Sequence, residues 1–285
     1  MNMNKKEYVV FILSYGRADK VYTYKTLKKQ GYTGEIYLIC SDDDKNLNDY
    51  KNTFENVYVF SKDDYVNTFD IADNFDDKRV VVYARNAVFD IAKELGYKYF
   101  IVLDDDYKTF RYTVDNNYNY LTKQRLCKDL DFQFNALLKY YKSIKAKTLC
   151  IAQDGDFIGG AGCSVFQKKL SRKAMNFFVC STDRRFNFVG RINEDVNTYV
   201  HFGSKGDLFL TICELRLNQL QTQQNTGGLT EFYLDGGTYV KSFYTLIFNP
   251  SSVRVSLVGT IHPRLHHRIN WNNTVPRIID ETFKK

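Results

Sequence analysis

Three consecutive aspartates, Asp104, Asp105 and Asp106, directly follow the apolar run at residues 99–103. A short apolar run of this kind is typical of a buried strand, which would deliver the carboxylates at its carboxyl end. Adjacent carboxylates repel one another, and burying them without a partner is costly. A divalent cation would relieve both penalties, and oxygen ligands suit Mg²⁺ or Mn²⁺, ions that usually also hold substrate phosphates. The pattern predicts a metal-bound nucleotide, with a solvated acidic turn as the alternative.

Alternating strands and helices are expected to position these aspartates. The sequence predicts strands at residues 8–13, 35–40, 56–60 and 99–103, and helices at 20–30 and 81–95. Such alternation indicates a mainly parallel sheet covered on both faces, with ligands bound outside the carboxyl ends of the strands. Ser14, Asp42 and Asp104 each follow a predicted strand, so we expect them at one edge of the sheet.

The second half of the chain has a more mixed pattern. We predict helices at residues 126–145, 170–178 and 193–202, and strands at 148–152 and 163–167. The fold class is therefore α/β with a mixed α+β C-terminal portion. Since we find no repeat and no linker, residues 1–285 are interpreted as one domain, with a nucleotide-binding half at 1–110 and an acceptor-binding half at 111–285.

Charge and cysteine usage limit the partners and the compartment. The net charge of +7 has the right sign for a polyanion such as a nucleotide, a nucleic acid or a surface polymer, although solubility alone also explains it. The six cysteines form no C-x-x-C pair, which fits thiols in a reducing compartment. We find neither a signal-peptide core nor an apolar stretch that would span a membrane, so we expect a cytoplasmic protein without membrane contact.

The segment Ser14-Tyr15-Gly16-Arg17 follows the first predicted strand. Its small residues would let a ligand approach the backbone, and its arginine offers two parallel donors to a phosphate. An ordinary turn between strand and helix explains the segment equally well.

Two further motifs lie at predicted helix starts. Arg85 could meet a diphosphate or one of the aspartates, or could simply be a surface arginine. Glu194 and Asp195 could stabilise the helix as a cap and through its dipole. Alternatively, one of these carboxylates is a general base that takes a proton from an acceptor hydroxyl.

In chain order these motifs resemble the GT-A class of nucleotide-sugar glycosyltransferases. The features that match are a nucleotide-binding loop after the first strand, an Arg-Asn helix, a D-x-D metal motif, a glycine loop and a Glu-Asp pair. They fall at residues 11–17, 84–86, 101–106, 159–162 and 193–195, within the first two-thirds of the chain. The whole chain looks most like the phage-encoded TET-associated glycosyltransferases, which modify hydroxymethylated pyrimidines in DNA.

The resemblance implies a divalent metal, Mn²⁺ or Mg²⁺, that bridges the diphosphate of a nucleotide sugar, with a UDP-sugar as the first expectation. It makes Asp104 and Asp106 the metal ligands, with Asp104 also near the ribose. A C-terminal histidine would complete the metal shell, and His262 is the candidate, with His266 and His267 as rivals. The implied donor-binding residues are Ser14, Tyr15, Gly16, Arg17, Asp42, Arg85, Asp104, Asp105 and Gly160.

If the enzyme inverts the anomeric carbon, the resemblance makes Asp195 the catalytic base, with Glu194 as second choice. A retaining enzyme would need no such base. The implied acceptor is 5-hydroxymethylcytosine in double-stranded DNA, whose base must leave the stack to react. Four basic clusters could contact its phosphates. They are Lys139, Lys142, Lys145 and Lys147; Lys168, Lys169, Arg172 and Lys173; Arg184 and Arg185; and Arg264 and Arg268 with Trp271.

Three alternatives stay open at this point. They are a GT-A enzyme of surface polysaccharide synthesis, a nucleotidyltransferase that activates sugars, and a catalytically inactive relative that binds DNA. Each basic cluster could also be no more than a solvated helix face.

Overall fold

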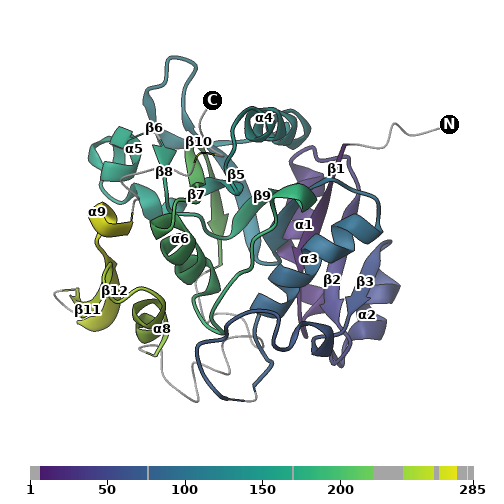
Figure 1. The fold of residues 1–285 in the computed structure, drawn as a ribbon. Helices are drawn as coiled ribbons and strands as arrows, with labels where there is room; N and C mark the ends of the chain where they lie inside the picture. The colour runs from purple at the N-terminus through teal and green to yellow at the C-terminus, as the bar shows by residue number, and fades with distance from the viewer. Residues whose placement is uncertain are drawn as a thin grey trace.

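The computed structural model describes residues 7–75, 77–168, 170–220, 240–259, 263–274 and 281. Within these residues, a ten-stranded sheet runs through the centre and a two-stranded ribbon lies beside it (Figure 1). The strand order is β3-β2-β1-β4-β9-β7-β10-β5-β6, and β8 pairs with β10. The predicted α/β class is confirmed.

The strands of the sheet are β1 Tyr8–Leu13, β2 Ile36–Ser41, β3 Val57–Phe60, β4 Tyr99–Asp104, β5 Tyr107–Val114, β6 Tyr120–Leu126, β7 Thr148–Gln153, β8 Leu170–Ser171, β9 Phe177–Ser181 and β10 Phe209–Gln219. The ribbon is β11 Val253–Val258 and β12 Arg264–Ile269. The α-helices are α1 Tyr22–Lys29, α2 Leu47–Thr53, α3 Val82–Glu94, α4 Leu130–Ser143, α5 Ser164–Lys168, α6 Glu194–Ser204, α8 Lys241–Phe248 and α9 Trp271–Thr274. Short 3-10 helices are η1 Ala18–Lys20, η2 Asp63–Tyr65, η3 Asp154–Phe157, η4 Gly160–Gly162 and η5 Thr182–Arg184.

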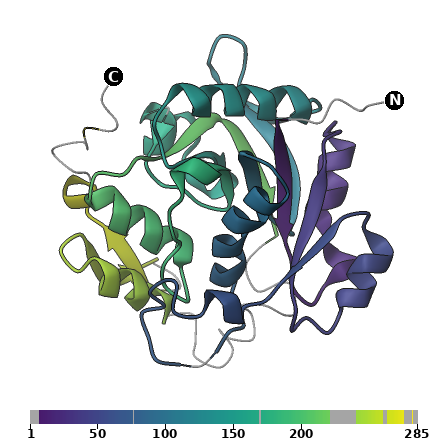
Figure 2. The ribbon, with the colours of Figure 1, turned by 45° about the vertical axis from the view of Figure 1, so that its right-hand side comes forward.

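Both faces of the sheet are buried around β1. Its six residues are all apolar, and successive side chains of a strand point to opposite faces. Val10 and Ile12 join a core cluster with residues of α1, α2 and α4. Val9 and Phe11 join a second cluster with residues of α3 and α6. Figure 2 shows α3 in dark blue and α6 in green on the second of these faces. A strand that is apolar throughout therefore lies in the middle of a three-layered structure.

The direction of the strands brings several loop starts to one edge. β3, β2, β1 and β4 are parallel, and β9 is antiparallel to both β4 and β7. β7 consequently runs in the same direction as β4, and β10 is parallel to β7. The carboxyl ends of all these strands except β9 share one edge, which we call the carboxyl edge. Ser14, Asp42, Asp104 and Asp154 lie at the ends of strands there, as the sequence predicts for the first three.

Two predictions in the second half are wrong. Residues 163–167 form no strand, because the backbone carbonyl of Cys163 accepts from Gln167 and starts α5. Residues 170–178 form no helix but contain β8 and the start of β9. Asn176, with φ +63°, has a left-handed backbone that a continuous helix cannot contain.

The predicted helix at 126–145 begins later, at Leu130. The carboxylate of Asp129 accepts from the backbone N–H of Phe132 and caps this helix start, whereas Leu126 is still the end of β6.

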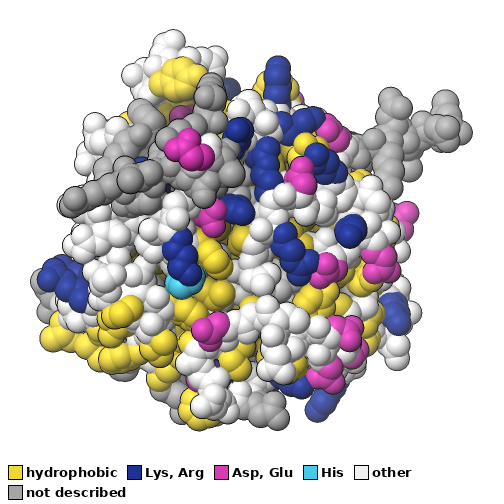
Figure 3. Space-filling model, in the orientation of Figure 1, with side chains coloured by type: hydrophobic (Ala, Val, Ile, Leu, Met, Phe, Trp, Pro, Cys, Tyr) yellow, Lys and Arg dark blue, Asp and Glu magenta, His cyan; other side chains and the backbone are white. Residues whose placement is uncertain are grey.

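The surface is mixed, with one apolar region. In Figure 3 hydrophobic side chains gather at the lower left, over α8 and the ribbon. Phe243 and Ile247 of α8 and Leu257 of β11 are exposed there. Among the described helices, none is both long enough and apolar enough to cross a membrane.

Candidate active site

Asp105 fastens the loop after β1 to the end of β4. Its side chain is 1% exposed, and Oδ2 accepts from the Ser14 hydroxyl at 2.5 Å and from Arg17 Nε at 2.9 Å. Burial raises the pKa of Asp105, while Arg17 and Ser14 act in the opposite direction. Asp105 thus holds the predicted donor loop in place through Ser14 and Arg17.

The same loop is held from a second side by α2 and the residues before it. Gly16, with φ +72°, donates its backbone N–H to Asp44 Oδ2 at 2.7 Å. Tyr50 Oη lies 2.6 Å from the Ser14 hydroxyl and accepts from the Arg17 backbone N–H at 3.0 Å. Glycine suits the left-handed conformation at this turn. The loop is therefore fixed before any ligand arrives.

Two other predicted donor residues border this loop. Tyr15 is half-buried, and the Lys62 ammonium lies 4.5 Å from the centre of its ring. Asp42 is exposed at the end of β2, where its backbone N–H donates to Phe60. Both lie at the carboxyl edge, as predicted.

Arg85 joins the aspartates of β4 to the start of α6. Its Nη2 lies 2.8 Å from Asp104 Oδ1, and its Nε lies 2.7 Å from Glu194 Oε1. The side chain is 2% exposed, and these two carboxylates raise the pKa of Arg85 against the effect of burial. Its buried Nη1 has no hydrogen-bond partner among the described residues. Of the alternatives for Arg85, the structure excludes the surface arginine.

Asp106 differs from its neighbours because no described residue forms an ion pair with its carboxylate. Burial, followed by the charges of Asp104 and Asp105, raises the pKa of Asp106 to about 7. Arg17 acts in the opposite direction but does not restore the ordinary value. Near neutral pH, a cation beside Asp106 would therefore be bound favourably.

Glu194 and Asp195 begin α6, and only the first of them forms an ion pair with a described residue. Glu194 is bound to Arg85, whereas Asp195 Oδ1 accepts the Val196 backbone N–H at 2.7 Å. Burial, followed by the charge of Glu194, raises the pKa of Asp195 to about 7, although Arg85 opposes the shift. A carboxylate with this pKa can accept a proton at neutral pH.

The start of α6 is positioned by residues that the sequence analysis did not assign. Asn86, next to Arg85 on α3, donates to the Phe188 carbonyl at 3.0 Å and accepts from the Phe188 backbone N–H at 2.8 Å. Gly190 has φ +83°, and a Cβ there would lie 2.1 Å from Asn197 Nδ2. A glycine shortly before a pair of carboxylates was the available signal for this tight approach.

Arg191 anchors the same turn to the loop before α3. It is 1% exposed, and its Nε lies 2.9 Å from Asp73 Oδ2. The backbone N–H groups of Gly190 and Arg191 donate to Asp70 and Ile71. Segments distant in sequence thus fix the direction in which Asp195 points.

The carboxylates at the end of β4 and the start of α6 are the candidates to hold a divalent metal. Asp104, Asp105, Asp106, Glu194 and Asp195 contribute five carboxylates, and only Arg17 and Arg85 form ion pairs with them among the described residues. The described residues contain no group of three or more His, Cys, Asp or Glu arranged to hold a metal. Mg²⁺, however, is commonly held by one or two carboxylates together with substrate phosphates. Asp106 and the second oxygen of Asp104 would serve this purpose.

The histidine expected to complete the metal shell, His262, lies outside the described residues. His267 lies beside the start of α6, with Nδ1 3.4 Å from Asn193 Nδ2. Burial, together with His266, Lys241 and Lys173, lowers the pKa of His267 to about 4, so its ring is neutral at pH 7.

Gly160 lies in η4, beyond the end of β7. A Cβ on Gly160 would lie 3.7 Å from the ring of Tyr120 on β6. The neighbouring Phe157 and Phe166 form a separate small core cluster there. No described contact joins Gly160 to the aspartates of β4.

Comparison with known families decides the class of protein. The family model described as TET-Associated Glycosyltransferase matches residues 8–228, more than half of the chain. The chain belongs to this family. It is a glycosyltransferase, and the predicted resemblance is confirmed. No curated protein matches the chain.

Two solved structures resemble this glycosyltransferase at a distance. A putative nucleotide-diphospho-sugar transferase from Desulfovibrio desulfuricans G20 has 9% identity and a TM-score of 0.41, covering 84% of this chain and 98% of its own. Glucosyl-3-phosphoglycerate synthase from Mycobacterium tuberculosis, in complex with Mn²⁺, UDP and phosphoglyceric acid, has 8% identity and a TM-score of 0.45. It covers 92% of this chain and 86% of its own.

Proposed function

We propose that this protein transfers a sugar from a nucleotide-sugar donor to the hydroxymethyl group of 5-hydroxymethylcytosine in double-stranded DNA, with the help of a divalent metal. Membership of the family supports the glycosyl transfer, and the resemblance to transferases of hydroxymethylated pyrimidines supports the DNA acceptor. The observation that supports the mechanism is that Arg85 joins Asp104 to Glu194, and that burial raises the pKa of the nearby Asp106 and Asp195 to about 7.

The donor would lie along the carboxyl edge. The loop from Ser14 to Arg17 would frame the nucleoside, with Asp42 at the end of the neighbouring strand. Asp104 and Asp106 would hold Mn²⁺ or Mg²⁺, which would offset the negative charge that develops on the leaving nucleoside diphosphate. A UDP-sugar is the first donor to test.

Asp195 is proposed as the general base of an inverting transfer. It would accept the proton of the hydroxymethyl group as the oxygen attacks the anomeric carbon and the bond from that carbon to the diphosphate breaks. Glu194 is less suited because Arg85 holds its carboxylate as an ion pair. Glu194 and Arg85 would instead fix the position of Asp195 relative to the donor.

Mass spectrometry of hydroxymethylcytosine-containing duplex DNA tests the proposal. The DNA is incubated with the protein, Mn²⁺ and a panel of nucleotide sugars, and its nucleosides are then analysed. We expect one sugar to be added to hydroxymethylcytosine and none to cytosine in an otherwise identical duplex.

The Asp195→Asn variant is the matched control, because it keeps the size of the side chain and removes its basicity. Loss of the product in this variant supports the base assignment. Transfer to a polysaccharide acceptor, with no product on any DNA, would instead favour surface polymer synthesis.

A further inference from the structure

The basic clusters found in the sequence lie in different parts of the fold. Lys142 of α4 forms an ion pair with Glu7 at 2.6 Å, beside the amino end of β1. Lys147 precedes β7, and its backbone N–H donates to Leu208 before β10. This cluster therefore lies at the amino ends of the parallel strands, opposite the candidate active site.

The pair Arg184 and Arg185 is engaged in structural contacts at the same amino ends. Arg184 Nη1 donates to the carbonyls of Tyr141, Ile144 and Ala146 around the end of α4. Arg185 forms an ion pair with Asp90 of α3. Neither arginine lies on the edge where an acceptor would approach Asp195.

The ribbon of β11 and β12 is different. Arg254 and Arg268 are directly opposite each other across the two strands, and Arg264 and His266 follow at alternate positions of β12. Residues that alternate along a strand, and their cross-strand partners, share one face. All three arginines are exposed, and none forms an ion pair with a described residue. We call this surface the arginine face.

An arrangement of this kind favours an anionic partner. Like charges directly opposite in an antiparallel pair are destabilising. The buried arginines of the described chain, such as Arg85 and Arg191, have carboxylate partners. The three arginines of the ribbon, which have no such partner among the described residues, instead concentrate positive charge on one exposed face.

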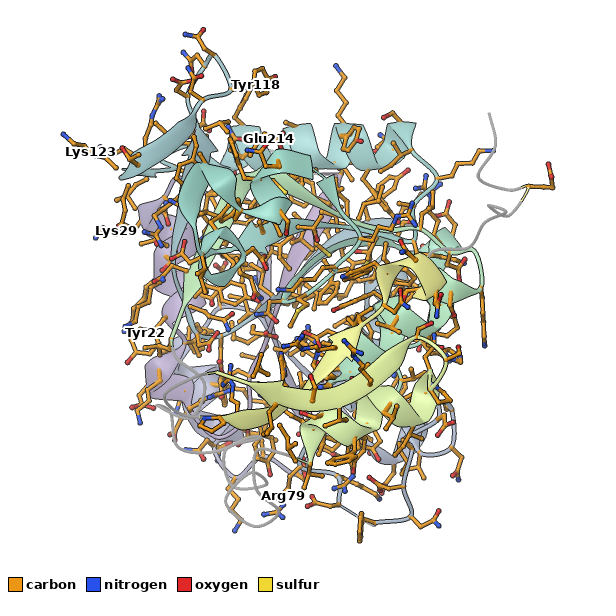
Figure 4. The ribbon with its side chains drawn as sticks, turned by 90° about the vertical axis from the view of Figure 1, so that its left-hand side faces the viewer. Tyr22, Lys29, Arg79, Tyr118, Lys123 and Glu214 are labelled. Carbon is orange, nitrogen blue, oxygen red and sulfur yellow. The ribbon has the colours of Figure 1, made fainter. Side chains whose placement is uncertain are left out.

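The ribbon also lies beside the candidate base. Ser242 of α8 donates to the Leu265 carbonyl at 3.3 Å, and Asn193 Nδ2 donates to the Lys241 carbonyl at 2.9 Å. Asn193 also contacts His267 and directly precedes Glu194. In Figure 4, where Tyr22 and Lys29 mark α1 at the left, the ribbon faces the viewer. His267 alternates with these arginines along β12, so it contacts Asn193 from the other face of the ribbon. Arg264 of the arginine face lowers the pKa of Lys241 and Asp195 raises it, which places Arg264 in the surroundings of Asp195.

We infer that the arginine face of the ribbon binds the phosphates of the duplex that carries the acceptor base. This inference rests on the proposed function and adds the surface that holds the DNA. Arginine is well suited to phosphate because its planar donors bind two oxygens at once. A two-stranded ribbon also has the dimensions to lie along a groove of duplex DNA.

The test is a salt titration of DNA binding by the triple variant Arg254→Gln, Arg264→Gln, Arg268→Gln. Binding of a fluorescent duplex is followed by anisotropy. Removing one arginine–phosphate interaction should reduce the slope of log K against log salt by about 0.9, so removing three should reduce it by about 3. The matched control replaces Lys139, Lys142 and Lys145, in and just after α4, by Gln. It removes the same charge and should keep most of the wild-type slope.

Two further measurements separate the possible results. UDP affinity and the unfolding midpoint of the triple variant should equal those of the wild type, which shows that its fold and donor site are intact. If the wild-type protein binds no duplex at low salt, duplex DNA is not the acceptor, and the ribbon does not bind it either. If the wild type binds and modifies DNA but the triple variant keeps the same slope, or if the lysine control shows an equal reduction, the arginine face is not the DNA surface.

Discussion

The end of β4 and the start of α6 each carry adjacent carboxylates. In each region one carboxylate forms an ion pair and its neighbour does not. Asp105 is paired with Arg17 and Ser14, and Glu194 is paired with Arg85. Their neighbours Asp106 and Asp195 have no such cation among the described residues, and burial raises the pKa of each to about 7. One carboxylate of each pair is thus compensated within the described part of the protein and the other is not.

This difference separates structural roles from catalytic ones. Removing one partner of a buried ion pair leaves a charge uncompensated and destabilises the fold. Burial also raises the pKa of Asp105, so the ion pair with Arg17 and not the direction of the pKa shift distinguishes it. An ionised carboxylate with a raised pKa and no paired cation destabilises the native state, so its presence is better explained by the reaction. The comparison predicts opposite effects of substitution at neighbouring positions.

The largest effect is expected for Asp195→Asn. Loss of a general base typically slows the chemical step by about 10²- to 10⁴-fold. We expect a decrease of this size in the rate of sugar transfer at saturating donor, without loss of stability at pH 8. Glu194→Gln is the companion variant and should lose stability as well as rate. If Asp195→Asn transfers sugar at the wild-type rate, Asp195 is not the general base.

Asp106→Asn should weaken metal binding. Mutation of a residue that only orients a metal ligand typically lowers the metal affinity by roughly 10- to 100-fold. Loss of a direct ligand should lower it by at least as much. Isothermal titration with Mn²⁺ in the presence of UDP measures this. Asp64→Asn is the control, because Asp64 is an exposed carboxylate without a proposed role in the site, and it should keep the wild-type metal affinity. Equal affinity in all three proteins would contradict the metal assignment.

Asp105→Asn should act mainly on stability. The substitution removes the anion that Arg17 and Ser14 bind, and loss of one partner from a buried pair typically costs about 3 kcal/mol. Urea denaturation at pH 7 measures the free energy of unfolding. A variant as stable as the wild type would show that Asp105 does not hold the loop.

The smallest effect concerns stability and pH. The native pKa of Asp106 and that of Asp195 are each raised from 3.8 to about 7. The contribution of such a group to the free energy of unfolding is fully present below pH 3.8 and is lost as the pH rises through 7. Asparagine cannot ionise, so Asp106→Asn and Asp195→Asn should each gain stability relative to the wild type between pH 5 and pH 8. The gain should be on the order of 2 kcal/mol, measured as the change in unfolding free energy without metal. If the difference in unfolding free energy between variant and wild type stays constant from pH 5 to pH 8, the pKa values are not raised.

The sequence predicts the parallel half of the fold well because its strands are continuous apolar runs between clear helices. Residues 8–13 and 99–103 coincide with β1 and with all but the last residue of β4, and the edge shared by Ser14, Asp42 and Asp104 follows from their direction. Predictions failed where local pattern and tertiary pairing disagree. The segment at 170–178 is too irregular to indicate β8 and β9, whose pairing depends on distant β10 and β4.

The site residues could be predicted from the sequence, but their pairing could not. Asp105 and Asp106 are identical in type and adjacent, and only the position of Arg17 distinguishes them. In the same way, the contact of Arg85 with both Asp104 and Glu194 joins three segments that are distant in the sequence. Asn86 and Arg191 were not assigned a role because their partners lie on other elements of the fold.

The most direct test of the account is the pH dependence of kcat/KM for sugar transfer to hydroxymethylcytosine DNA, measured from pH 5.5 to 8.5 with saturating metal. Bound metal would keep Asp106 ionised across this range, so that Asp195 remains as the titrating carboxylate. We predict that the wild-type rate rises to a plateau with an apparent pKa near 7, and that the residual rate of Asp195→Asn lacks this rise. A flat wild-type profile, or the same rise in Asp195→Asn, would contradict the role of Asp195 as the base.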